Sequence, residues 1–143
     1  MRYALAIAFA LALATGAAAH TQTGALGAAA SATDFYQVTC SDDGSGPPQS
    51  LILQIQDTTS GSAPLVGVQG QRGSQTTNEV DPTSGDTNPS PQTYVNGTSG
   101  VFDVIVYKTG AGADSYTLTY HCYTGLNGTG VHTGTTIVWH QNQ

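Results

Sequence analysis

The stretch DSYTLTYHCY, residues 114–123, decides the fold class because apolar and polar side chains alternate along it. The aromatic and apolar members that share one face are Tyr116, Leu118, Tyr120 and Cys122. Such a period of two residues predicts a half-buried β-strand. The segment VFDVIVYK at 101–108 repeats the pattern, and the glycine-rich KTGAGAD between the two predicts a hairpin loop.

Strand signals also occur on both sides of this hairpin. They are the segments at 33–40, 50–57, 64–69 and 133–141. After residue 32, no segment combines a helical hydrophobic period with helix caps. The sequence therefore predicts an all-β fold, an antiparallel β-sandwich of six to eight strands. The polar residues 70–92 are expected to form a long loop with weak strand character at most.

The two cysteines, Cys40 and Cys122, each occur on the apolar face of a predicted strand. In an exported protein, a single pair of cysteines favours one disulfide, which here would join an early strand to a late one. In the chain-entropy model, closing a loop of this length contributes about 4 kcal/mol. A metal thiolate and two free thiols are the alternatives, whereas haem attachment would need the motif CxxCH, which the sequence lacks.

The N-terminal residues have the features of a secretory signal. Arg2 precedes an apolar run at 4–14 that is too short to span a bilayer, and the three alanines at 17–19 suit signal peptidase. The expected divisions are a signal peptide at 1–19, a flexible leader at 20–32 and a single β-sandwich domain at 33–143. Cleavage one or two residues earlier also fits, and an uncleaved anchor is the alternative. We expect a secreted protein, extracellular or periplasmic, without membrane association after cleavage.

The charge composition argues against one class of partner. Charged residues make up only 8% of the chain, well below the usual quarter. Without the signal peptide, Arg72 and Lys108 are the only cations against nine acidic residues. So few cations provide no surface for phosphate backbones, and we expect no nucleic-acid partner.

The four histidines are the most informative ionisable residues, and they are His20, His121, His132 and His140. If cleavage after Ala19 makes His20 the first residue, its amine and imidazole offer two nitrogen ligands in one chelate. Copper(II) favours nitrogen ligands in tetragonal geometry, and any of the other histidines could supply the next one. By strand parity, His121 points away from the core. Copper or zinc binding is therefore one interpretation, and four solvated histidines are the ordinary alternative.

Two acidic loops are candidate calcium sites, because calcium prefers oxygen ligands. Their carboxylates are Asp42, Asp43, Asp81 and Asp86. Neither loop matches the EF-hand pattern, and aspartate is also common in turns. The sequence contains neither Gly-x-Ser-x-Gly nor HExxH, so we expect no enzyme, with a copper redox enzyme as the alternative.

The order of the strand motifs resembles the prepeptidase C-terminal domain, a family of secreted β-sandwiches. The matching pieces are Asp34-Phe35-Tyr36, LILQIQD at 51–57, GVFDVIV at 100–106 and SYTLT at 115–119. The likeness covers about residues 33–120 and implies a non-catalytic extracellular module, sometimes calcium-binding, that aids attachment or secretion. The chain departs from the family in its cysteine pair and at 70–92, and no protease precedes the domain in this sequence. Its cysteine pair and the late Trp139 also resemble those of an immunoglobulin-like sandwich.

Three classes of function fit these features. The favoured one is a small secreted, non-catalytic binding or surface module that is stabilised by a disulfide. The second is a periplasmic or extracellular copper-binding protein that uses a mature N-terminal His20. The third is a self-assembling extracellular structural subunit that pairs through exposed strand edges. The partner of the favoured module would be an extracellular protein, a glycan or another copy of the chain, and aromatics that could stack on a glycan are Tyr94, Tyr107, Tyr123 and Trp139.

Overall fold

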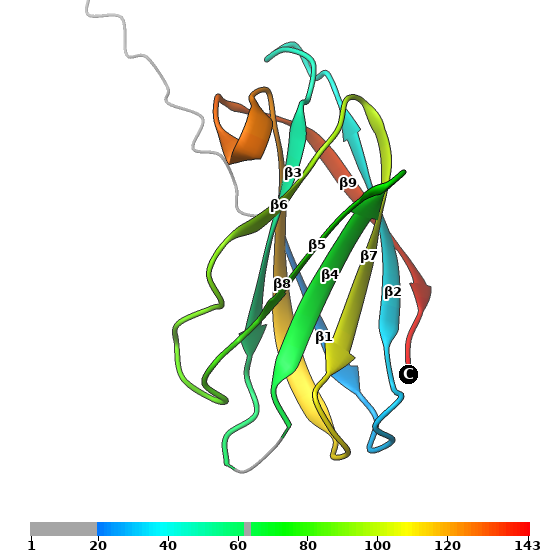
Figure 1. Ribbon diagram of the computed structural model, residues 1–143, viewed down its shortest axis with the longest axis vertical. Coiled ribbons are helices and arrows are strands. Elements are labelled where there is room, and N and C mark those ends of the chain that lie inside the picture. Colours follow the sequence, from blue (N-terminus) through cyan, green and yellow to red (C-terminus); the bar gives the residue numbers. More distant parts are fainter. Residues whose placement is uncertain (1–19, 62–63) are drawn as a thin grey trace, which may run out of the picture.

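Nine strands and one short 3-10 helix make up the computed structural model, which describes residues 20–61 and 64–143 (Figure 1). The signal peptide expected at 1–19 lies outside the described residues. The elements are β1 (Thr21–Leu26), β2 (Asp34–Ser41), β3 (Ser50–Asp57), β4 (Val66–Arg72), β5 (Gln75–Val80), β6 (Thr93–Asn96), β7 (Gly100–Lys108), β8 (Asp114–Tyr123), η1 (Leu126–Gly128) and β9 (His132–Gln141). The predicted all-β antiparallel fold is confirmed. In the part of the chain that the structure describes, no helix is both long and apolar enough to cross a membrane.

The strands form two antiparallel layers that β9 connects. One layer has the order β1-β8-β3-β6, and the other has the order β5-β4-β7-β2-β9. β9 begins on β8, where His132 faces Tyr123, and it pairs with β2 from Gly134 onward. The hydroxyls of Thr77 on β5 and Thr93 on β6 form a hydrogen bond, so the outermost strands of the two layers also meet. The sandwich is therefore nearly closed into a barrel.

The core lies between the layers and is built from the alternating faces of the strands. On β8, every second residue from Asp114 to Cys122 is buried, and β7 alternates in the same way from Phe102 to Lys108. Cys40 and Cys122 form a disulfide in this core, with their Cα atoms 5.6 Å apart. The bond joins β2 to β8 across the two layers, which confirms the predicted inter-strand disulfide.

The leader expected to be flexible at 20–32 contains a strand, so that expectation is wrong for Thr21–Leu26. These residues form β1 and pair with β8, which raises the number of strands to nine. A glycine makes the close approach feasible, because a Cβ on Gly24 would lie only 2.3 Å from the hydroxyl oxygen of Tyr116. β1 is hard to recognise from sequence because its fully buried apolar residue is Leu26 alone.

The long loop expected at 70–92 is also corrected, because its first part forms a hairpin. β4 extends to Arg72, and β5 (Gln75–Val80) runs back antiparallel to it. The turn includes Gly73, whose φ of 58° lies in the left-handed region that glycine tolerates. β5 is an outer strand with exposed or half-buried residues, so it needs no apolar face, and its polar composition conceals it in the sequence.

A fully buried polar network links β2 to β8. The hydroxyl of Tyr116 donates a hydrogen bond to Asp34 Oδ2, and the hydroxyl oxygens of Tyr36 and Tyr116 lie 2.5 Å apart. The backbone N–H of Gln143 donates to Asp34 Oδ1 at 2.8 Å. Because Tyr116 has one hydroxyl proton, Tyr36 must be the donor in the tyrosine pair. Burial raises the pKa of both tyrosines, that of Tyr36 to about 12, so both hydroxyls stay protonated.

Candidate metal centre

The candidate site lies where two strands meet end to end along one edge of β8. β3 occupies the other edge of β8, from Tyr116 to Tyr123. On the opposite edge, β1 pairs with β8 as far as Thr119, and β9 pairs with the last two residues of β8. The strand ends therefore meet beside Tyr120 and His121, the two residues between these paired stretches.

This junction brings three histidines together. The carbonyl oxygen of His20, the residue before β1, accepts a hydrogen bond from the Tyr120 N–H at 3.0 Å. His132 is the first residue of β9 and faces Tyr123, while His121 lies on β8 itself. The arrangement depends on the pairing of β1 and β9 with the same edge of β8.

The three imidazoles are close enough to share one ion. Their ring centroids are 5.0 Å apart for His20 and His132, 5.3 Å for His121 and His132, and 5.6 Å for His20 and His121. One ring nitrogen from each lies within 4.8 Å of the others. Within residues 20–61 and 64–143, this is the one group of three potential metal-ligating side chains with that property. All three side chains are partly buried.

Two of the ring nitrogens are left without hydrogen bonds. His20 Nδ1 and His121 Nδ1 are buried and have no partner. A buried polar atom that loses water without gaining a partner costs about 1–3 kcal/mol. Native proteins leave few such atoms, so two of them in one cluster need a specific explanation.

The environment of the cluster favours neutral imidazoles, which are the form that binds metals. Burial, together with the nearby His132 and His20, lowers the pKa of His121 to about 4. Burial also lowers the pKa of His132, and His20 adds to this effect, whereas Asp43 opposes it. At neutral pH, His121 and His132 therefore have lone pairs available.

Thr135 determines which nitrogen of His132 is available. The Thr135 hydroxyl donates its one proton to the Thr133 carbonyl oxygen at 2.9 Å and accepts a hydrogen bond from the Cys122 N–H at 3.0 Å. His132 Nε2 lies 3.3 Å from the same hydroxyl oxygen. Because the hydroxyl proton is already used, Nε2 must be the donor in this contact. The lone pair of neutral His132 is therefore on Nδ1, which could bind a metal ion.

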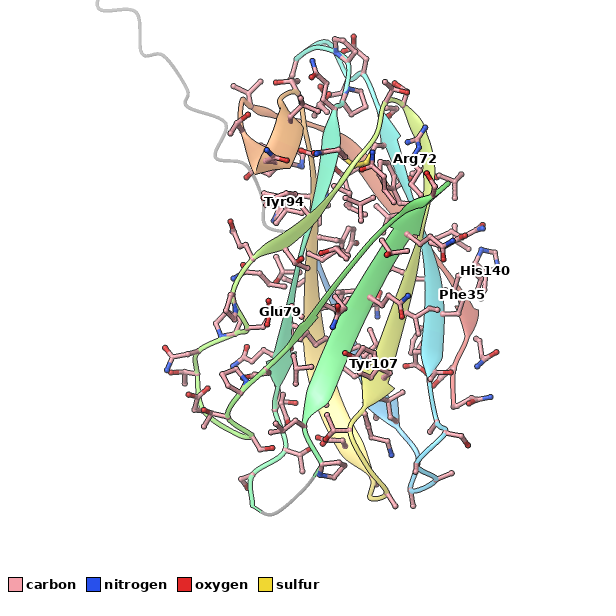
Figure 2. All side chains as sticks on the ribbon, viewed as in Figure 1. Phe35, Arg72, Glu79, Tyr94, Tyr107 and His140 are labelled. Atoms are coloured by element: carbon pink, nitrogen blue, oxygen red, sulfur yellow. A yellow bond between two sulfur atoms is a disulfide. The ribbon has the colours of Figure 1, made fainter. Side chains whose placement is uncertain are left out.

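The fourth histidine lies apart from this cluster. His140 is near the end of β9, where its ring is 5.5 Å from that of Phe35 on β2. Figure 2 shows the two labelled side chains next to each other at the outer flank of the sandwich. The structure therefore groups three of the four histidines that the sequence singles out, and it separates His140 from them.

The candidate calcium ligands serve as hydrogen-bond acceptors for backbone N–H groups. Asp42 Oδ1 accepts from the Gly44 N–H at 2.8 Å, and Asp43 Oδ1 accepts from the Ser45 N–H at 3.0 Å. Such hydrogen bonds also lower the pKa of Asp43. The corresponding acceptors in the other loop are Asp81, bonded to the N–H groups of Asp57 and Thr83, and Asp86, bonded to that of Asn88. Apart from the bond between Asp57 on β3 and Asp81, these contacts are typical of turns, and they do not bring the two loops into one cluster.

The candidate glycan-binding aromatics do not share one strand or one layer. Tyr94 lies on β6 and Trp139 on β9, which belong to different layers. Both are exposed, but the Trp139 ring also stacks on Tyr36 at 5.3 Å. Tyr123 instead lies beside the histidines, with its ring 6.3 Å from those of His121 and His132.

Sequence reasoning missed two residues that shape the metal centre. Thr135 carries no motif, and its role is visible only once the start of β9 is placed on β8. Gly24 allows β1 to approach β8 and thereby places His20. Comparison of the chain with protein-family models, with curated proteins and with solved structures finds no match, so the resemblance to the prepeptidase C-terminal domain stays a prediction and the chemistry of the site rests on its own residues.

Proposed function

We propose that the protein is an exported, non-catalytic binding module whose ligand is a single transition-metal ion held by His20, His121 and His132. The observation that carries this proposal is that three ring nitrogens, one from each histidine, lie within 4.8 Å of one another. In addition, His20 and His121 each have a buried ring nitrogen without a hydrogen bond. Export is supported by the predicted signal peptide and by the disulfide between Cys40 and Cys122.

Metal binding explains the unsatisfied nitrogens better than does the alternative of ordinary, solvated surface histidines. A solvated histidine has water as its partner, whereas His20 Nδ1 and His121 Nδ1 are shielded from solvent. A bound cation would accept the lone pairs of these two nitrogens. It would also compensate for the desolvation that lowers the pKa of His121.

The ligand set indicates copper(II) or zinc(II) rather than calcium. Imidazole nitrogen suits both transition metals, whereas calcium takes six to eight oxygen ligands. Metal–imidazole bonds are about 2.0–2.1 Å long, so ligating nitrogens end up about 3–4 Å apart. The ring nitrogens now lie within 4.8 Å of one another, so they would need to approach by about 1 Å. Small changes in the side-chain rotamers can supply this movement.

Titration of the exported protein with metal ions, monitored by isothermal titration calorimetry, tests the proposal. We expect one equivalent of copper(II) or zinc(II) to bind, and calcium not to bind at the same site. His121→Ala and His132→Ala should each weaken binding at least about tenfold, since each removes one ligand. The matched control is His140→Ala, which removes a histidine outside the cluster and should leave affinity unchanged.

Two results would contradict the proposal. One is a wild-type protein that retains neither copper nor zinc. The other is an equal loss of affinity in His140→Ala and His121→Ala, which would indicate nonspecific binding by surface imidazoles. Near-ultraviolet circular dichroism of each variant shows that the fold is preserved during the comparison.

A further inference from the structure

We propose that cleavage of the Ala19–His20 bond completes the metal centre, because the new α-amine of His20 becomes a fourth nitrogen ligand and makes the site selective for copper(II). This inference rests on the proposed metal-binding function. The inference adds a processing step to that function, because the precursor and the processed chain would differ in their affinity for copper(II) at the same site.

The position of His20 provides the first argument. Its carbonyl oxygen is held by the Tyr120 N–H at 3.0 Å, and the next residue begins β1. The backbone of His20 is thus attached to the edge of β8, while its ring lies in the histidine cluster. An α-amine created at this residue would belong to an anchored ligand and not to a free tail.

The free nitrogen of the His20 ring provides the second argument. Within one histidine, the α-nitrogen and Nδ1 are separated by three carbon atoms, so both can bind one metal ion in a six-membered chelate ring. Nε2 lies on the far side of the imidazole and cannot close that ring. His20 Nδ1 is buried and has no hydrogen-bond partner, so the nitrogen that the chelate requires is unoccupied.

The chemistry of the cleaved bond explains the dependence on processing. In the precursor, the nitrogen of His20 belongs to a planar amide whose lone pair is delocalised into the carbonyl group. Hydrolysis consumes one water molecule, leaves a carboxylate on Ala19 and gives His20 an amine. Because an α-amino group has a pKa of about 7.7–8.0, a metal ion can displace its proton near neutral pH.

The remaining ligands come from the two strands at the junction. His132 offers Nδ1, because its Nε2 donates to Thr135, and His121 offers a neutral imidazole from β8. Together with the amine and Nδ1 of His20, they make a set of four nitrogens. Copper(II) prefers such a set in tetragonal geometry and binds nitrogen ligands more tightly than zinc(II) does.

The test compares two forms of the processed chain with copper(II) alone as the probe. One form begins at His20 with a free amine, and the other begins at His20 with an acetylated α-amine. Short N-terminal extensions are unsuitable as controls, because their own amines can bind copper together with deprotonated amides and the His20 ring. Intact mass verifies both N-termini and shows that Lys108 is unmodified.

We expect the free amine to raise copper(II) affinity about a hundredfold over the acetylated form, as closing a chelate would. Nitrogen hyperfine structure in the electron paramagnetic resonance spectrum should indicate four nitrogen ligands in the free form and three in the acetylated form. Equal affinity and equal spectra would overturn the role of the amine while leaving the three-histidine site intact. Absence of copper binding in both forms would overturn the proposed function itself, and an exported protein that begins at another residue would overturn the processing step.

Discussion

Two polar clusters contact β8, and they differ in how fully their hydrogen-bonding groups are satisfied. In the cluster of Asp34, Tyr36 and Tyr116, each carboxylate oxygen and each hydroxyl has a hydrogen-bond partner. In the cluster of His20, His121 and His132, two buried ring nitrogens have none. The first is complete within the protein and links its strands. The second leaves two nitrogens without a partner inside the protein, which is why we propose it as a binding site.

Breaking the complete network should have the largest effect. Tyr116→Phe removes the donor to the buried Asp34 carboxylate and the acceptor for Tyr36, so we expect the free energy of unfolding to fall by about 3 kcal/mol. Chemical denaturation measures this loss. The control is Tyr107→Phe on β7, a residue labelled in Figure 2, which removes a hydroxyl that is not part of the network and should cost much less. Equal losses in the two variants would contradict a structural role for the network.

Removing the incomplete cluster should instead affect the metal-bound protein. With free metal at a hundred times the dissociation constant, binding stabilises the wild type by about 2.7 kcal/mol. We expect this increment to vanish in the double variant His121→Ala/His132→Ala. Metal-free stability should change by less than about 1 kcal/mol, because losing packing is offset by removing an unsatisfied buried nitrogen. A metal-independent loss as large as that of Tyr116→Phe would show that the histidines are structural.

Acidification should destabilise the metal-free protein through the histidine cluster. His121 has a folded pKa of about 4 and an ordinary pKa of 6.5, so the unfolded chain binds a proton within this range and the folded chain does not. Stability from this residue is therefore complete above pH 6.5 and falls by about 1–2 kcal/mol as the pH decreases toward 4.

Comparison with His121→Gln isolates this contribution. Asp57 acts in the opposite direction, because burial raises its folded pKa, but its contribution is common to both proteins. Denaturation at pH 4, 5, 6 and 7 should give a shallower dependence in the variant than in the wild type. Parallel curves would indicate that His121 has an ordinary pKa in the folded protein.

The smallest expected effect concerns the tautomer of His132. Thr135→Val removes the hydroxyl that accepts from His132 Nε2, and we expect metal affinity to fall about tenfold. Nitrogen-15 spectra of the histidine side chains should show His132 protonated on Nε2 in the wild type and as a mixture of tautomers in the variant. Thr135→Ser should restore both the tautomer and the affinity. Lower affinity without a change of tautomer would leave Thr135 with a packing role alone.

The sequence predicts the strands that bury one face and misses those that do not. β7 and β8 are evident because apolar residues occupy alternate positions from Phe102 to Val106 and from Tyr116 to Cys122. β1 escapes recognition because Gly24 replaces an apolar side chain opposite Tyr116. β5 escapes it because an outer strand can be polar throughout.

Prediction of the metal centre from sequence is limited in a similar way. Parity predicts that His121 points outward, and composition makes all four histidines candidates. Which of them meet depends on long-range pairing, since β1 and β9 share one edge of β8 although more than 100 residues separate His20 from His132. No local pattern encodes that pairing, so His140 could not be set apart from the others in advance.

The most direct test of the metal centre is a zinc(II) titration followed by nitrogen-15 spectra of all four histidine side chains. Zinc is diamagnetic, so each imidazole stays observable when the metal binds. We expect the signals of His20, His121 and His132 to change together and to saturate at one equivalent, while those of His140 stay constant. Signals that remain unchanged at one equivalent, or a response of His140 equal to that of the other three, would contradict the proposed metal centre.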